Sequence, residues 1–213
     1  MITLPATFME LSNYFKNIIE RQELLGYHMP KILRTPADKS AVAETERILK
    51  LTFNQELNQL YSIADGVNLD YITPSGLTGL IPIYNFLSLS DATEYYKVQV
   101  DFDEAFHNWE TNFKPGKHLF PFLQSDGNCY WVDLNEETEN YSNIYWTNTL
   151  AEDPEYLFSS LTSMFKTISD CYDNGIFKLD EEGYLDCDYN AWGHVAQKNN
   201  PEIKYWSLYN SQQ

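Results

Sequence analysis

The side chains of this chain that could do chemistry are four histidines, three cysteines and several adjacent carboxylates. The histidines lie at spacings unlike any local metal-ligand pattern. The cysteines, Cys129, Cys171 and Cys187, form no Cys-x-x-Cys pair, so neither a disulfide framework nor a structural zinc site is indicated. The chain also lacks a serine-nucleophile elbow, a phosphate-binding loop, a dinucleotide fingerprint and a His-Glu-x-x-His motif. We therefore predict a protein that is not an enzyme and binds no cofactor or metal; a hydrolase with dispersed catalytic groups is the competing hypothesis.

Two acidic segments could in principle hold a cation or transfer protons. Residues 180–188 offer many carboxylate oxygens, but they lack the alternating ligands and terminal glutamate of a calcium loop, which favours a solvated loop. Glu136 and Glu137 are adjacent on an acidic turn, where neighbouring side chains point in different directions. Neither segment predicts catalysis.

The net charge of the chain favours a positively charged protein partner. It is −17 overall, and residues 101–213 carry 20 of the 31 acidic side chains but only 6 of the 14 basic ones. Such a surface repels nucleic acid and anionic membranes, and it steers a basic protein toward itself. The competing interpretation is that the acidic surface only keeps the protein in solution. Because no apolar run approaches signal-peptide or membrane-span length, we expect a cytoplasmic location.

The elements that must position these residues begin with helices. Apolar side chains recur every three or four residues in 7–25, which predicts a helix ended by Gly26. A second helix is predicted over 39–50, and a third begins at Asn54 as its N-cap.

Strands and further helices are predicted in the middle of the chain. Residues 80–84 suggest an edge strand containing a proline, and a helical pattern runs from 90 to 109. The segment 119–134 is predicted to form a hairpin around an Asp-Gly turn, and a third strand is predicted at 144–146. Asp153-Pro154 predicts the start of a helix that continues to 172.

The aromatic pairs of the predicted strands are possible interface anchors. Side chains alternate along a strand, so one member of Tyr130-Trp131 and one of Tyr145-Trp146 should face outward. The alternative is that helices or the less regular extension 176–213 cover these rings. The predicted fold is α+β, with a central antiparallel sheet and helices mainly on one face, in a single domain over 1–213.

The order of three motifs resembles the SUKH superfamily. They are Leu57-Asn58-Gln59-Leu60-Tyr61-Ser62-Ile63-Ala64-Asp65-Gly66, then Gly79-Leu80-Ile81-Pro82, then Phe120-Pro121-Phe122 followed by Asp126-Gly127-Asn128 and a strand ending at Asp133-Leu134. The resemblance covers about residues 39–172. It implies the α+β fold, and it groups the chain with Smi/Knr-type cell-wall regulators and with bacterial immunity proteins that block a toxin, often a nuclease.

The resemblance and the charge together predict an immunity-type protein that neutralises a basic toxin, with a nuclease domain as the expected partner and with no nucleic-acid or membrane partner. A housekeeping regulator or scaffold of the same fold is the alternative. The predicted partner-binding residues are Asp101, Asp103, Glu104, Glu110, Asp133, Glu136, Glu137, Glu139, Tyr145, Trp146, Asp180, Glu181 and Glu182.

Overall fold

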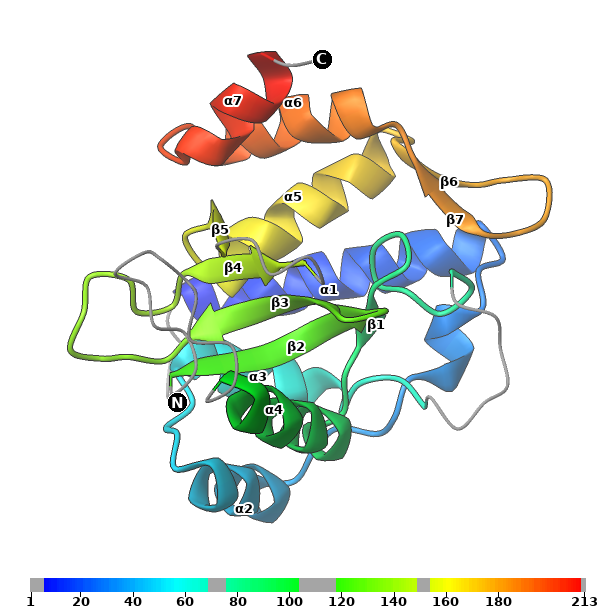
Figure 1. Ribbon diagram of the computed structural model, residues 1–213. Coiled ribbons are helices and arrows are strands. Elements are labelled where there is room, and N and C mark those ends of the chain that lie inside the picture. The colour runs from blue at the N-terminus through cyan, green and yellow to red at the C-terminus, as the bar shows by residue number, and fades with distance from the viewer. Residues whose placement is uncertain (1–5, 69–75, 104–117, 149–153, 212–213) are drawn as a thin grey trace.

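Helices at both ends of the chain enclose a central antiparallel sheet. The computed structural model describes residues 6–68, 76–103, 118–148 and 154–211 (Figure 1). Its elements in chain order are α1 (Ala6–Leu24), the 3-10 helix η1 (Met29–Ile32), α2 (Lys39–Leu49), α3 (Gln55–Ile63), β1 (Asn85–Phe86), α4 (Leu89–Asp103), β2 (Leu119–Ser125), β3 (Asn128–Asp133), β4 (Ile144–Thr147), β5 (Glu155–Phe158), α5 (Leu161–Asp173), β6 (Phe177–Leu179), β7 (Leu185–Cys187), α6 (Tyr189–Asn199) and α7 (Lys204–Ser211).

The helices predicted in the first third are confirmed, because their determinants are local. The Asn54 side chain accepts a hydrogen bond from the Leu57 backbone N–H at 2.7 Å and so caps α3, as its N-cap position requires. Gly26 follows α1 with a φ of +76°, a conformation that glycine adopts without steric cost. The helix predicted from residue 90 is α4, and residues 104–109 of that prediction lie outside the described residues.

The sheet is a meander of five antiparallel strands in the order β1-β2-β3-β4-β5. The predicted hairpin is β2 and β3, joined at Asp126-Gly127, with both residues at positive φ. The predicted edge strand at 80–84 is wrong, because these residues form a tight turn in which the Tyr84 backbone N–H donates to the Ile81 carbonyl at 3.0 Å.

The helix predicted to start at Asp153-Pro154 is also wrong in its first part. Residues Glu155–Phe158 form β5, which pairs with β4, and the helix starts at Leu161 with Ser160 as its N-cap. The carboxylate of Glu56, on α3, accepts a hydrogen bond from the Leu161 backbone N–H at 3.0 Å. This start depends on a partner that is more than 100 residues away in the sequence, which no local pattern shows.

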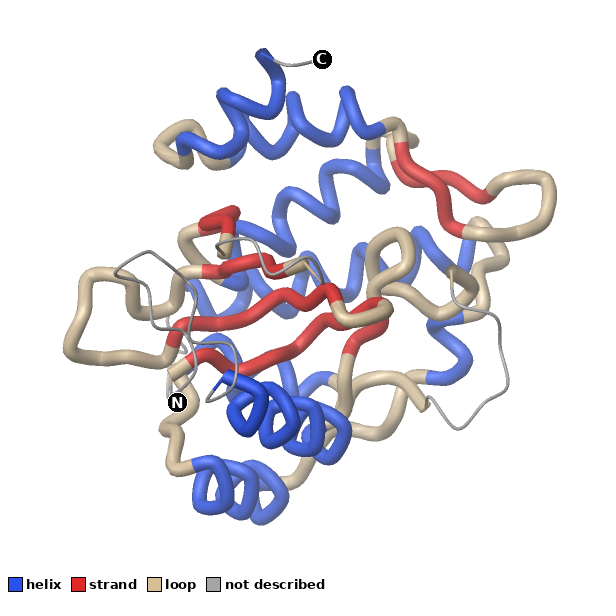
Figure 2. Tube along the Cα trace, in the orientation of Figure 1, coloured by secondary structure: helices blue, strands red, loops and turns tan. Residues whose placement is uncertain are grey.

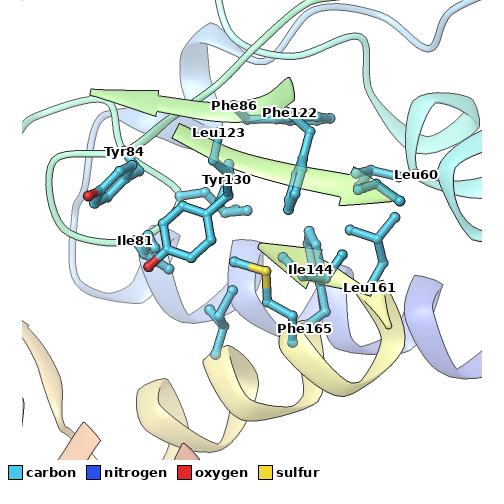
Figure 3. Close-up of a cluster of buried hydrophobic side chains, with 14 of the residues drawn as sticks. Leu60, Ile81, Tyr84, Phe86, Phe122, Leu123, Tyr130, Ile144, Leu161 and Phe165 are labelled. Carbon is cyan, nitrogen blue, oxygen red and sulfur yellow. The ribbon is translucent and has the colours of Figure 1, made fainter. Parts of the chain in front are cut away.

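Both faces of the sheet are covered, one of them by most of the helices. Helices α1, α3 and α5 pack on one face, over a buried cluster that includes Leu60, Phe122 and Phe165 (Figure 3). The Phe15 and Phe165 rings stack there with centroids 5.8 Å apart. Helix α4 lies against the other face (Figure 1). Its Tyr95 ring packs there on Trp131. Both faces of the sheet are therefore largely shielded from solvent, and large aromatic side chains are buried on each of them.

The C-terminal segment, residues 176–211, is regular, whereas the sequence suggested a less regular extension. It forms the β6-β7 hairpin and then α6 and α7, which lie over α5 (Figures 1 and 2). Asn200 is fully buried and accepts a hydrogen bond from the Ser163 hydroxyl of α5 at 2.8 Å. The Trp206 indole N–H donates to the Leu157 carbonyl of β5 at 2.7 Å, so the segment is tied to both α5 and the sheet.

Candidate functional site

The predicted partner-binding carboxylates do not all gather on one side of the protein. Glu136, Glu137 and Glu139 are exposed on the loop between β3 and β4, here named the 136–139 loop. Residues 180–182 are exposed on the turn between β6 and β7, here named the 180–182 turn. The two segments lie at opposite ends of the molecule (Figure 1), so a single small contact cannot include both.

Asp133 has a structural environment that sequence reasoning did not foresee. Its side chain is buried, with 6% of its surface exposed, and its Oδ1 accepts a hydrogen bond from the Asn135 backbone N–H at 2.8 Å. Burial raises the pKa of this carboxyl. The expectation that Asp133 offers a carboxylate at the surface is therefore wrong, because the side chain starts the turn that presents the 136–139 loop.

Four of the predicted residues cannot be placed as side chains. Asp101 and Asp103 lie in the last turn of α4, where only the backbone is described. Glu104 and Glu110 lie outside the described residues. The expectation that these four carboxylates contact a partner thus stays a prediction.

The aromatic pairs differ from each other in exposure. Tyr130 and Trp131 are both buried, so the expectation that one of them faces outward is wrong, because helices cover both faces of the sheet. Tyr145 is buried against Tyr156, with ring centroids 5.5 Å apart. Trp146 is half-buried, and its indole N–H donates to the Tyr84 hydroxyl at 2.8 Å. Only Trp146 of the four remains accessible to a partner.

Trp146 lines a groove between the sheet and the C-terminal segment. The groove has a volume of about 200 Å³, and among the described residues fourteen line it, nine of them aromatic. They come from the 81–84 turn, β3, β4, β5 and the C-terminal segment. We name this feature the aromatic groove; its lining includes Tyr84, Tyr130, Trp146, Tyr189, Tyr205 and Tyr209.

Buried hydrogen bonds fix the wall of the aromatic groove that the 81–84 turn forms. The Tyr27 hydroxyl donates to the Gly76 carbonyl at 2.7 Å and accepts from the Gly79 backbone N–H at 3.0 Å. The Tyr172 hydroxyl of α5 donates to the Leu80 carbonyl at 3.2 Å. Buried bonds of this kind are costly to break, so α5 and the segment after α1 hold the turn in place.

The same turn holds a strained residue at the groove. Pro82 and Ile83 are its two central residues, and Ile83 has a φ of +66°. A turn of this type favours glycine at the position of Ile83, because a β-branched side chain is disfavoured at positive φ. The Ile83 side chain is 43% exposed. Strained residues of this kind cluster at functional sites, so the position of Ile83 favours the groove as a functional site.

The ionisable groups that line the groove are held neutral. Burial, together with the Glu155 carboxylate, raises the pKa of the Tyr205 hydroxyl to about 12. Burial, together with the Asp186 and Asp188 carboxylates, raises the pKa of the Cys187 thiol to about 12. A thiol in this state is a poor nucleophile at neutral pH. Within the described residues, no three histidine, cysteine or carboxylate side chains gather as metal ligands would.

The fold defines an α+β protein built on a five-stranded antiparallel meander, with an aromatic groove between the sheet and the C-terminal segment. The SMI1 / KNR4 family (SUKH-1) model matches residues 36–167, which is more than half of the chain. The chain therefore belongs to this family, and the resemblance to the SUKH superfamily is confirmed. No curated protein matches the sequence.

The family match also divides the aromatic groove in two. The 81–84 turn and β3–β5 lie within the matched residues, whereas Cys187, Tyr189, Tyr205 and Tyr209 lie beyond them. The wall of the groove that the C-terminal segment forms therefore lies outside the region that the family model matches. None of the described helices combines the length and apolar composition needed to cross a lipid bilayer.

Proposed function

We propose that this protein is of the immunity type: it binds a cognate toxin and blocks it, and the toxin is a basic protein, with a nuclease domain as the expected partner. The observation that carries this proposal is membership of the SMI1 / KNR4 (SUKH-1) family combined with a net charge of −17. A nuclease surface built to attract phosphates is also attracted to carboxylates. The protein acts by binding and carries out no reaction of its own.

The exposed carboxylates offer two separate regions for such a contact. A standard interface buries about 800 Å² on each partner, against a total accessible surface of 11716 Å² for this chain. The 136–139 loop and the 180–182 turn lie at opposite ends of the molecule, so one standard interface covers only one of them (Figure 1). The other region contributes by long-range attraction alone, which physiological salt screens strongly.

The test begins with a secreted toxin encoded beside this chain, or with a partner recovered by pull-down. We expect a basic partner whose association rate falls steeply as salt is added, and whose toxic activity is lost on stoichiometric mixing. A partner that is not basic, bound with an affinity that salt does not change, would instead support the housekeeping regulator or scaffold.

Charge reversal then locates the contact. One variant carries Glu136→Lys, Glu137→Lys and Glu139→Lys, and a second carries Asp180→Lys, Glu181→Lys and Glu182→Lys. We expect one of them to slow association by about tenfold or more and the other to have a much smaller effect. The matched control reverses the three exposed glutamates of α1, which are Glu10, Glu20 and Glu23. Equal effects of all three variants would mean that net charge alone matters and that neither region is the contact.

A further inference from the structure

The size of the aromatic groove suits one side chain better than a small-molecule ligand. Its volume of about 200 Å³ is below the roughly 300–1,000 Å³ that is usual for ligand pockets. Ile83 is 43% exposed and Tyr189 is 57% exposed, so two of the lining residues are accessible from solvent. Large accessible aromatic rings around a small concavity are typical of a site that receives an anchor from a partner protein.

Two tryptophans of the groove have their indole N–H groups bonded within the protein. The Trp146 indole N–H is bonded to the Tyr84 hydroxyl, and the Trp206 indole N–H is bonded to the Leu157 carbonyl. Their donors are therefore occupied inside the protein. The π face of an indole or phenol ring carries partial negative charge and attracts cations.

Carboxylates lie beside these rings, and none of the fourteen lining residues within the described part of the chain is basic. Glu155 stands directly opposite Trp146 in the β4-β5 pair, so its side chain points to the same face of the sheet as the tryptophan. Asp188, which is exposed, lies between the lining residues Cys187 and Tyr189. Aromatic rings next to carboxylates, with no basic side chain among the lining residues that the structure describes, are complementary to a positively charged group.

We propose that the aromatic groove binds the side chain of an arginine residue presented by a protein partner, with the guanidinium against the aromatic rings and close to Glu155. Arginine fits better than lysine, because its planar guanidinium stacks on aromatic rings and is more weakly hydrated than an ammonium group. This inference deepens the proposed function, and it rests on that function only in supposing that the partner is a protein.

The left-handed Ile83 supports the assignment independently of charge. Since this conformation is unfavourable for isoleucine, it persists only because the surrounding bonds impose it. The Leu80 N–H donates to the Tyr84 carbonyl at 2.8 Å and the Tyr84 N–H donates to the Ile81 carbonyl at 3.0 Å, which closes the turn. The buried hydroxyls of Tyr27 and Tyr172 hold the residues 76–80 that lead into it. The 81–84 turn is thus pre-organised, so a side chain that enters the groove does not have to order this wall.

The experiment uses acetyl-arginine-methylamide as the probe and the full-length protein. Binding is followed by ¹H–¹⁵N NMR, with the indole N–H of Trp146 as the reporter inside the groove. We expect a saturable shift of this signal with a Kd in the millimolar range, and weaker binding of the lysine analogue. The citrulline analogue, which has nearly the same shape but no charge, should cause no saturable shift.

Two variants test the residues that the proposal names. Tyr189→Ala should weaken arginine binding about three- to tenfold, and Glu155→Gln about two- to fivefold. Their matched controls are Tyr141→Ala and Glu10→Gln, which lie outside the lining of the groove and should leave the Kd unchanged. Circular dichroism checks that each variant is folded, and Glu155→Gln on the surface keeps the test valid should the Tyr189 variant fail to fold.

The outcomes separate this inference from the proposed function. Equal binding of the citrulline and arginine analogues, or no shift at Trp146, would overturn the arginine site even if a toxin partner is found. Selective arginine binding at Trp146 that Tyr189→Ala weakens would support the site even if no toxin partner exists.

Discussion

Substitution of Gly66 tests whether a close backbone approach is the reason for glycine in the Asp65-Gly66 motif. Its φ is +70°, and a Cβ added there would lie 2.3 Å from the Ser88 backbone nitrogen and 2.4 Å from the Leu87 carbonyl carbon. The backbone at Leu87 and Ser88 cannot shift easily, because hydrogen bonds hold both sides of it. The Leu87 N–H donates to the Phe122 carbonyl of β2 at 2.9 Å, and the Leu89 N–H donates to the Asp65 carboxylate at 2.8 Å. The glycine therefore permits two chain segments to touch where α4 begins.

The expected loss for Gly66→Ala follows from three contributions. The left-handed conformation costs alanine about 1–2 kcal/mol, and the lower entropy of the unfolded chain returns about 0.4–1 kcal/mol. Forcing a methyl group into a filled space costs about 1–3 kcal/mol more. We expect the free energy of unfolding to fall by about 2–4 kcal/mol in total.

The matched control is Gly26→Ala, which separates the conformational contribution from the steric one. Gly26 has nearly the same φ, +76°, but a Cβ there would meet no atom within 4 Å. Only the first two contributions apply, so its loss should be about 1 kcal/mol or less. Urea unfolding followed by circular dichroism measures both values. Equal losses in the two variants would refute the close approach as the reason for the glycine in this motif.

Two further predictions concern burial. Because burial raises the pKa of Asp133, the stability that its neutral form supports is fully present below the unfolded-state pKa of about 3.9 and is lost as the pH rises through the folded-state pKa. Asp133→Asn keeps an oxygen that accepts the hydrogen bond from the Asn135 N–H, so the variant should become more stable relative to the parent as the pH rises from 4 to 7. Urea titrations measure the difference in unfolding free energy between the two proteins, and a difference that does not grow over this range would contradict the prediction. Trp206→Ala removes a side chain that is 2% exposed and should lower the free energy of unfolding by about 3–5 kcal/mol. Tryptophan fluorescence and far-ultraviolet circular dichroism should still report one midpoint, whereas two midpoints would show that the C-terminal segment unfolds separately.

The parts of the fold that the sequence predicts are those with local causes. Asn54 caps α3 through a bond to a residue three positions away, and Asp126-Gly127 forms the β2-β3 turn by itself. The α+β class follows from such elements in order, as does the resemblance to the SUKH superfamily. These features depend on short stretches of chain, which is why spacing and turn residues reveal them.

The errors arise where distant residues decide the structure. Residues 155–158 follow a plausible helix start, yet they pair with β4, and Glu56 of α3 caps the helix that begins at Leu161 instead. The C-terminal segment is anchored by scattered contacts such as Trp206 on Phe158, with ring centroids 5.4 Å apart. The aromatic groove joins segments from residue 81 to residue 209, so no single window of sequence contains it.

Where a toxin binds at the groove, the position of the groove relative to the carboxylates fixes which acidic region the toxin contacts. The 180–182 turn and Cys187, which lines the groove, belong to the same hairpin. Cys187 is five residues after Glu182, and five residue steps of extended chain span at most about 17 Å. A circular interface of about 800 Å² has a radius of about 16 Å, so a partner centred on the groove reaches the edge of this turn. An arginine bound in the groove thus requires charge reversal at 180–182 to slow association more than reversal at 136–139; the opposite order would place the toxin contact away from the groove.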